Sequence, residues 1–259
     1  MLYRFLLATG RPMSLPFPPE ILAALALAAL AAGLVRGFSG FGAAMTFVPV
    51  AAALAGPKIA VAVLWIMDTV PTLIIVVPAL KKVDWRTIAP IAAGYAVTVW
   101  AGVWLLANGD PQVLRWAISL AILATVPVLW SGWRYRGARP FVLSAGVGGV
   151  SGIMGGAAQL SGPPVLIYWL ASDDPAWRIR ANVIVLFFAL SALSGTSMAV
   201  NGLFDLDAVM AGVICAPVFG LALLIGQRGF AHATDAGYRR FAFVLILIVA
   251  IATLPVFGG

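Results

Sequence analysis

The sequence has few charged residues and very few of the side chains that bind metals or form disulfides. Asp, Glu, Lys and Arg make up 10% of the 259 residues, whereas an ordinary soluble domain contains about 25%. The one cysteine, Cys215, lies in an apolar run, which excludes a disulfide framework. The one histidine, His232, lies in a polar loop, which argues against a histidine metal cluster or a Ser-His-Asp triad. We therefore expect no enzyme, no metal site and no cofactor.

Apolar residues account for 63% of the chain and gather in long runs. A helix of about 20 residues, rising ~1.5 Å per residue, crosses the ~30 Å hydrocarbon core of a bilayer. The composition and the run lengths predict an all-α polytopic membrane protein whose solvent is the lipid bilayer. The runs lie near residues 21–35, 59–80, 87–107, 112–132, 141–171, 179–200, 208–227 and 241–257.

The chain has the pattern of a duplication. GFSGFG at 37–42 resembles GVSGIMGG at 149–156, and Asp84 in KKVDWR matches Asp205 in NGLFDLD. Chance similarity among Gly- and Ala-rich helices is the alternative, but the matches occur in the same order in both halves. We therefore divide the chain into an N-terminal segment, 1–20, a first transmembrane repeat, 21–140, and a second transmembrane repeat, 141–259.

Each repeat opens with an apolar segment that is too long for one straight crossing. These segments are 20–56 and 141–171, and the second would run ~46 Å as a single helix. Glycines free the backbone in the middle of each segment, and Pro163 and Pro164 stand where proline begins a new helix. Each segment is thus predicted to be a broken pair of half-helices, either re-entrant or discontinuous, followed by three transmembrane helices.

The distribution of Lys and Arg favours pairs that fold back. If every run crosses, the two sides hold eight and seven basic residues, with no bias. If both broken segments are hairpins and Arg36 lies inside the first break, one side holds Arg4, Arg11, Lys58 and Arg115, and the other holds the remaining eleven. Cytoplasmic loops carry the excess of Lys and Arg. This predicts inverted repeats in a cell (inner) membrane with both termini outside, whereas a long tilted broken helix would remove the bias.

The breaks have the chemistry of an anion site. A helix that starts at membrane depth leaves backbone N–H groups unpaired, and its dipole adds roughly half a positive charge. Close helix packing through GxxxG spacing is the alternative use of the glycines. The substrate-binding residues that we predict at the two breaks are Arg36, Ser39, Gly40, Gly42, Ser151, Gly152, Gly155, Gly156, Gln159, Ser161, Gly162 and Pro163.

Two ionisable residues within apolar segments have several interpretations. Asp68 could carry a coupling proton, neutralise Arg36, or bind a broken backbone, and its approximate counterpart in the second repeat is Asn182. Arg36 could contact an anionic substrate, pair with Asp68, or reach a headgroup. We treat Asp68 and Asn182 as coupling candidates and Arg36 as the candidate fixed charge of the anion site.

The ordered set of motifs resembles the TauE/SafE family of sulfite and organosulfonate exporters. The resemblance is carried by GFSGFGAAMTFVPV at 37–50, VDW at 83–85, GGVSGIMGG at 148–156 and GQRGFAHATDAGYRRF at 226–241. The family has a denser run of glycines after the first break, part of which is replaced here by Ala43 and Ala44. The resemblance implies export or exchange of small sulfur-containing or carboxylated anions, driven by an ion gradient.

These observations predict a secondary transporter of small anions such as sulfite, organosulfonates or related carboxylates. A passive anion channel is the main alternative, a scaffold or assembly factor is a further one, and a membrane enzyme would need a catalytic cluster that the sequence lacks. The net charge of +7 is expected to record topology, and we expect no nucleic-acid partner. The predicted partners are a small anionic substrate, the lipid bilayer and a coupling proton or sodium ion, with a homodimer as the candidate assembly.

Overall fold

The computed structural model describes residues 15–110, 140–170 and 174–234, together with isolated positions at 112–120 and 236–244. Regular structure in these residues is entirely helical. The elements are α2 (Pro19–Ser39), α3 (Ala43–Ala55), α4 (Pro57–Ala79), α5 (Trp85–Asn108), α7 (Phe141–Ala158), α8 (Gly162–Leu170), α9 (Ala176–Val200) and α10 (Leu206–Phe230). The apolar runs expected at 112–132 and 241–257 lie largely outside the described residues.

Six of these helices, namely α2, α4, α5, α7, α9 and α10, are long and apolar enough to cross a membrane. Their apolar side chains are buried between helices on one face and exposed on the other, as for helices whose outer face contacts lipid rather than water. The all-α polytopic membrane fold predicted from the apolar runs is therefore confirmed.

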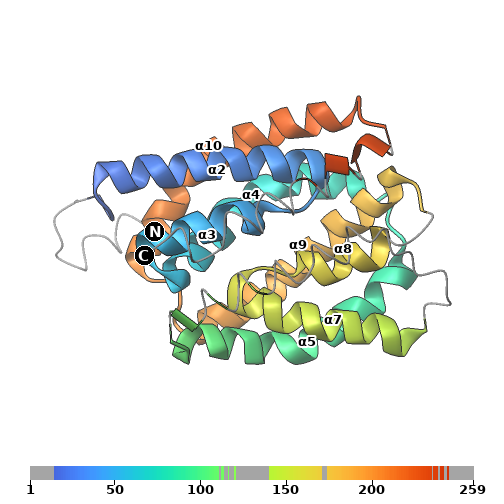
Figure 1. Cartoon of the computed structure of the whole chain (residues 1–259), viewed down its shortest axis with the longest axis horizontal. Helices are drawn as coiled ribbons and strands as arrows, with labels where there is room; N and C mark the ends of the chain where they lie inside the picture. Colours follow the sequence, from blue (N-terminus) through green and yellow to red (C-terminus); the bar gives the residue numbers. More distant parts are fainter. Residues whose placement is uncertain are drawn as a thin grey trace.

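The two broken segments form helical pairs that fold back. In Figure 1, α3 returns along the direction from which α2 came, and α8 does the same after α7. The prediction of two half-helices is wrong for the first member of each pair, because α2 has 21 residues and α7 has 18. The apolar run starts well before each break, so a helix of nearly full membrane length forms first. The short members, α3 with 13 residues and α8 with 9, span only about 20 and 14 Å.

The helix contacts repeat between the two halves. Helix α2 packs against α10 and α7 packs against α5, while α4 packs against α10 and α9 packs against α5. The duplicated aspartates also share a role, since Asp84 caps the N-terminus of α5 and Asp205 caps that of α10. In each case a carboxylate oxygen accepts a hydrogen bond from a backbone N–H of the first turn. The orientation of the two halves relative to a membrane stays a prediction.

Glycines allow the closest helix contacts in the molecule. On α2, a Cβ at Gly33 or Gly37 would overlap backbone carbonyls of α10. On α7, a Cβ at Gly148 would overlap the carbonyl of Ile91 on α5. The glycines at GxxxG spacing, Gly33 and Gly37 on α2 and Gly148 and Gly152 on α7, therefore have the packing role that was the alternative to substrate binding. These interfaces hold the outer helices together and leave the two breaks facing the interior.

Candidate anion site at the two helix breaks

The first break is built from a local sequence that ends one helix and starts another within three residues. Gly40 and Gly42 have φ angles of 81° and 84°, in the left-handed region that glycine adopts without strain. The Gly40 N–H donates to the Arg36 carbonyl, and the single O–H of Ser39 lies within hydrogen-bond distance of the carbonyls of Val35, at 2.7 Å, and Phe41, at 2.8 Å. Ser39 therefore stabilises the turn, and its hydroxyl is occupied by backbone.

The C-terminal carbonyls of α2 are bound by side chains from the second half of the chain. The Arg180 guanidinium on α9 donates to the carbonyls of Phe38, at 3.0 Å, and Gly37, at 2.6 Å. The Tyr238 hydroxyl donates to the Ser39 carbonyl at 2.8 Å. A cation at the C-terminus of a helix also interacts favourably with the helix dipole. The end of α2 is thus fixed to both α9 and the chain segment that follows α10.

The second break has a different chemistry. Gln159 has a φ angle of 57°, which is uncommon for a residue other than glycine, and its backbone N–H donates to the Gly155 carbonyl. Its side-chain Nε2 donates to the Ser194 hydroxyl at 2.9 Å. The hydroxyls of Tyr95 and Ser161 both lie beside Gly155. Neutral amide and hydroxyl groups therefore support this break, and no charged side chain of the described residues binds it.

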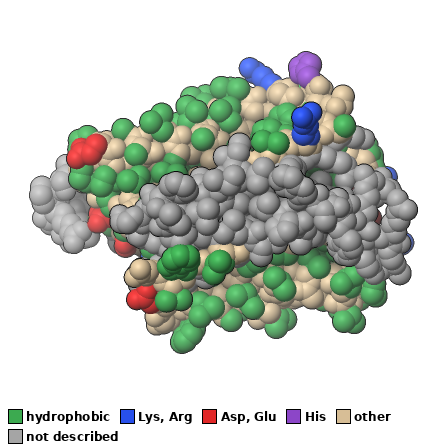
Figure 2. All heavy atoms as spheres, in the orientation of Figure 1, with side chains coloured by type: hydrophobic (Ala, Val, Ile, Leu, Met, Phe, Trp, Pro, Cys, Tyr) green, Lys and Arg blue, Asp and Glu red, His purple; other side chains and the backbone are tan. Residues whose placement is uncertain are grey.

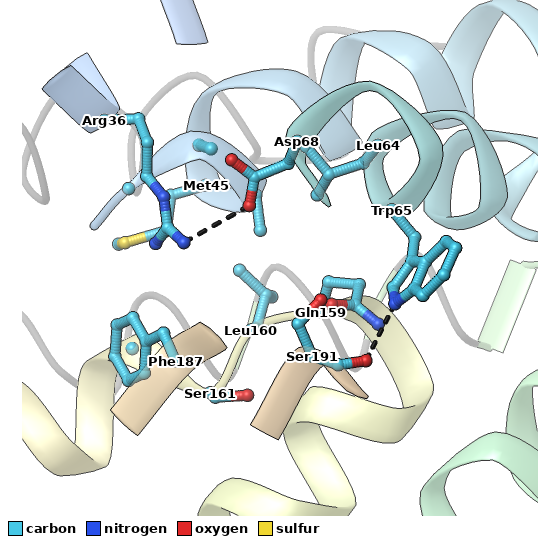
Figure 3. Close-up of a pocket in the computed structure, with 14 residues that line it drawn as sticks. Arg36, Met45, Leu64, Trp65, Asp68, Gln159, Leu160, Ser161, Phe187 and Ser191 are labelled. Atoms are coloured by element: carbon cyan, nitrogen blue, oxygen red, sulfur yellow. Dashed lines mark hydrogen bonds and ion pairs between the residues drawn. The ribbon is translucent and has the colours of Figure 1, made fainter. Parts of the chain in front are cut away.

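Both breaks contribute to one pocket inside the bundle. Arg36 and Met45, in the first turn of α3, face Gln159 and Ser161 across it (Figure 3), and Gly42 and Gly162 also line it. The cavity volume is about 50 Å³, which is room for roughly three to five water molecules or a compact ion of similar size. The lining residues are Arg36, Gly42, Ala43, Ala44, Met45, Leu64, Trp65, Asp68, Gln159, Leu160, Ser161, Gly162, Phe187 and Ser191.

An ion pair supplies the formal charges of the pocket. The Arg36 Nη2 lies 3.2 Å from the Asp68 Oδ2, and the two side chains are 6% and 15% exposed. The Arg36 Nη1 donates to the Gly40 carbonyl at 3.0 Å, while its buried Nε has no hydrogen-bond partner in the described part of the chain. Contact with Asp68, one of the three interpretations of Arg36, is observed. The burial of the Arg36 side chain is incompatible with contact to a lipid headgroup.

The helix ends add a positive potential to the pocket. Gly42, the N-cap of α3, supplies no side-chain acceptor for the first turn, and Ala43, Ala44 and Met45 line the cavity. The first N–H groups of a helix lack acceptors within that helix, and the dipole places roughly half a positive charge at this end. Helix α8 begins at Gly162, which also lines the cavity. The arrangement can therefore hold an anion by hydrogen bonding and by charge.

The predicted site residues divide into two groups. Arg36, Gly42, Asp68, Gln159, Ser161 and Gly162 line the pocket. Ser39, Gly40, Ser151, Gly152, Gly155 and Gly156 do not line it; the glycines of α7 pack against α5, and the buried Ser151 hydroxyl has no partner among the described residues. The side chain of Pro163 lies outside the described residues. Proximity to a break in the sequence therefore does not by itself bring a residue into the cavity.

Two polar residues of α9 act at helix ends rather than in the pocket. The Asn182 side chain accepts a hydrogen bond from the Asp84 N–H at 2.8 Å and donates to Thr87 at the start of α5, and Asn182 does not line the pocket with Asp68. Arg180, one of the eleven basic residues counted on the cytoplasmic side, lies within α9 and binds the end of α2. A polar residue inside an apolar run can therefore hydrogen-bond backbone groups at a helix end instead of lining a substrate pathway.

Sequence analysis missed Trp65 and Ser191, which both line the pocket. The Trp65 Nε1 donates to the Ser191 carbonyl at 2.7 Å, so α4 is joined to α9 at this wall. A Cβ on Gly195 would overlap the Trp65 ring, so the glycine leaves room for this ring to pack against α9. Trp65 stands three residues before Asp68, and residues at that spacing share a helix face, so the signal was present in the sequence.

Comparison with known proteins agrees with this architecture. The chain matches the family described as "Sulfite exporter TauE/SafE" over residues 25–253. It is 30% identical over 185 residues to "Probable sulfite/organosulfonate exporter TauE" from Cupriavidus necator, an alignment that covers 68% of this chain and 71% of that protein. No solved structure matches. The family match covers most of the chain and includes both breaks, and the protein therefore belongs to the TauE/SafE family.

Proposed function

We propose that this protein is a secondary transporter that exports small oxyanions, such as sulfite, organosulfonates or related carboxylates, through the pocket between the two breaks. The observation that carries the proposal is the meeting of Arg36 with the N-terminal ends of α3 and α8 in one buried cavity. A relative named as a probable sulfite/organosulfonate exporter supports the substrate class.

The donors of the pocket suit an oxyanion. A guanidinium presents its N–H groups as a fork that matches two oxygens of a sulfite, sulfonate or carboxylate group. The backbone N–H groups at the start of a helix have no acceptor within that helix. Ala43 and Ala44, the first residues of α3, line the same cavity, and Ser161 and Gln159 line its opposite side. An anion held between them would contact both repeats, and alternating access through rocking of one repeat against the other needs this arrangement.

The surface charges support a topology in which the α4–α5 turn is cytoplasmic. In Figure 2 acidic side chains lie at one end of the visible face and basic side chains and His232 at the other. In Figure 1 the first end holds the start of α2, the end of α5 and the start of α10, near Glu20, Asp110 and Asp205. The opposite end holds Lys81, Lys82, Arg86, Arg178 and Arg228. The positive-inside rule therefore favours inverted repeats with the N-terminus outside.

Flux measurements in proteoliposomes test the proposal. The purified protein should move ³⁵S-labelled sulfite at a rate that saturates with concentration and responds to an imposed ion gradient. Arg36→Gln should lose this flux, while Thr69→Val, a neutral change on α4 at a residue outside the pocket lining, should retain it. Flux that rises linearly with sulfite concentration would instead indicate the passive channel. The absence of any sulfite or organosulfonate flux in the parental protein would refute the proposal.

A further inference from the structure

The Arg36–Asp68 ion pair occupies the place that an anionic substrate needs. Both side chains line the pocket, and the pair is made through Nη2, one of the outward donors of the guanidinium (Figure 3). The Nη1 is already bound to the Gly40 carbonyl. A substrate that uses the guanidinium as a fork must therefore share Nη2 with Asp68 or displace its carboxylate.

Asp68 has a second partner that remains when the carboxylate leaves Arg36. The Thr72 hydroxyl, one turn further along α4, donates to the Asp68 Oδ1, while Arg36 contacts the Oδ2. Thr72 is buried and lies on the same helix, so this hydrogen bond does not depend on how α2 and α4 are placed. Arg36 keeps only the neutral Gly40 carbonyl when Asp68 leaves, since its Nε lacks an acceptor among the described residues.

Without substrate and without Asp68, Arg36 would be an unpaired cation within the membrane. Insertion scales assign a cost to such a charge that corresponds to a population penalty on the order of a hundredfold. A transporter must change conformation both with and without its substrate if it is to move substrate in one direction. The step without substrate is the one that this cost would slow, because Asp68 is the one anionic side chain among the described residues that line the pocket.

We propose that Asp68 is a substitute anion, which pairs with Arg36 when the substrate has left and so allows the empty protein to change conformation. This inference rests on the proposed function, because it assumes an anion site at Arg36. Binding of substrate displaces the Asp68 carboxylate from Arg36 and leaves it bound to Thr72, and release of substrate restores the ion pair. The role of Asp68 is then to make net export possible, whereas one-for-one exchange of substrate needs only the loaded states.

The experiment compares net efflux with exchange in the same proteoliposomes. Vesicles loaded with ³⁵S-labelled sulfite are diluted into buffer without sulfite, which measures net efflux, or into buffer with unlabelled sulfite, which measures exchange. Asp68→Asn should raise the ratio of exchange to net efflux on the order of a hundredfold. Asp68→Ser should do the same through a smaller neutral side chain, and Asp68→Glu, which keeps a carboxylate, should remain near the parental ratio.

The outcomes separate this inference from the proposed function. Exchange by a neutral variant shows that the variant is folded, and Thr69→Val, which changes no charge in the pocket, should keep the parental ratio. A parental ratio in Asp68→Asn or Asp68→Ser, or equal loss of both fluxes in both variants, would overturn the role of Asp68 while leaving the anion site at Arg36 intact. Parental flux in Arg36→Gln would instead overturn the anion site itself.

Discussion

Neutralising Arg36 alone and together with Asp68 should separate anion binding from stability. The two side chains form a buried pair at 3.2 Å. Removing one member of a buried pair costs about 3–5 kcal/mol because the other charge is left uncompensated, whereas neutralising both is often without net cost. Since the Asp68 side chain is 15% exposed and keeps Thr72, we expect a loss near the lower limit, about 3 kcal/mol, for Arg36→Gln.

The affinity for sulfite should depend on the presence of the Arg36 side chain and not on the stability of the folded protein. A hydrogen bond to a charged group contributes about 1.5–3 kcal/mol, and about 1.4 kcal/mol changes a dissociation constant tenfold. The Kd for sulfite should therefore rise roughly 10- to 100-fold for each guanidinium hydrogen bond that Arg36→Gln removes, with a smaller rise in Arg36→Lys. The double variant Arg36→Gln/Asp68→Asn should regain stability but not affinity.

Thermal unfolding followed by tryptophan fluorescence, with and without sulfite, reports both quantities. Ligand at 100 times its Kd stabilises the folded protein by about 2.7 kcal/mol, so the parental protein should gain apparent Tm as sulfite is added. The double variant should unfold near the parental Tm without sulfite and show no gain with it. A double variant that binds sulfite with the parental Kd would refute the assignment of Arg36. A double variant as unstable as Arg36→Gln would refute the ion-pair explanation of stability.

The remaining predictions concern packing, the end of α2 and topology. Gly148→Ala should lower the apparent Tm, because the added Cβ would overlap the backbone of α5 at a cost of about 1–3 kcal/mol. Gly146→Ala should leave the Tm unchanged, because the space around its Cβ is open. A lower Tm in both variants would contradict the packing role of Gly148. Arg180→Met should lower the Tm by removing two charge-assisted hydrogen bonds, about 1.5–3 kcal/mol each, and Arg180→Lys should recover part. Cysteines replacing Lys58 and Lys82 should react with an impermeant thiol reagent from outside and inside, respectively, and labelling from the same side would refute the hairpin topology.

Local sequence could predict the breaks and the helix caps because each is determined within a few residues. Gly40 and Gly42 can adopt positive φ, and a chain that reverses inside an apolar run needs this freedom. Asp84 and Asp205 accept hydrogen bonds from backbone N–H groups within their own first turns. The start of α8 at Gly162 likewise follows from the Gly-Pro-Pro sequence, in which proline stands in the first turn.

Local sequence could not predict which residues meet across the pocket. Trp65 bonds to a residue that is 126 positions away, and Arg180 bonds to one that is 143 positions away. Asn182, the residue that counting pairs with Asp68, does not line the pocket, because its side chain is hydrogen-bonded at the start of α5. At the shift between the capping aspartates, Asp68 aligns with Ala189, and this alignment gives the second repeat no carboxylate at that position.

Because of that asymmetry, the two repeats contribute different groups to anion binding. A second buried arginine opposite Arg36 would hold a small anion between two fixed cations, and the anion would be costly to release. The second break instead offers the Gln159 amide, which donates to Ser194, and the Ser161 hydroxyl, which lies near the Tyr95 hydroxyl; both groups can donate to an oxyanion. Neutral donors bind more weakly than charged ones. The duplication therefore supplies two helix N-termini, while the sequence differences between the repeats confine the strong charge to one side of the pocket, where Asp68 can replace the substrate.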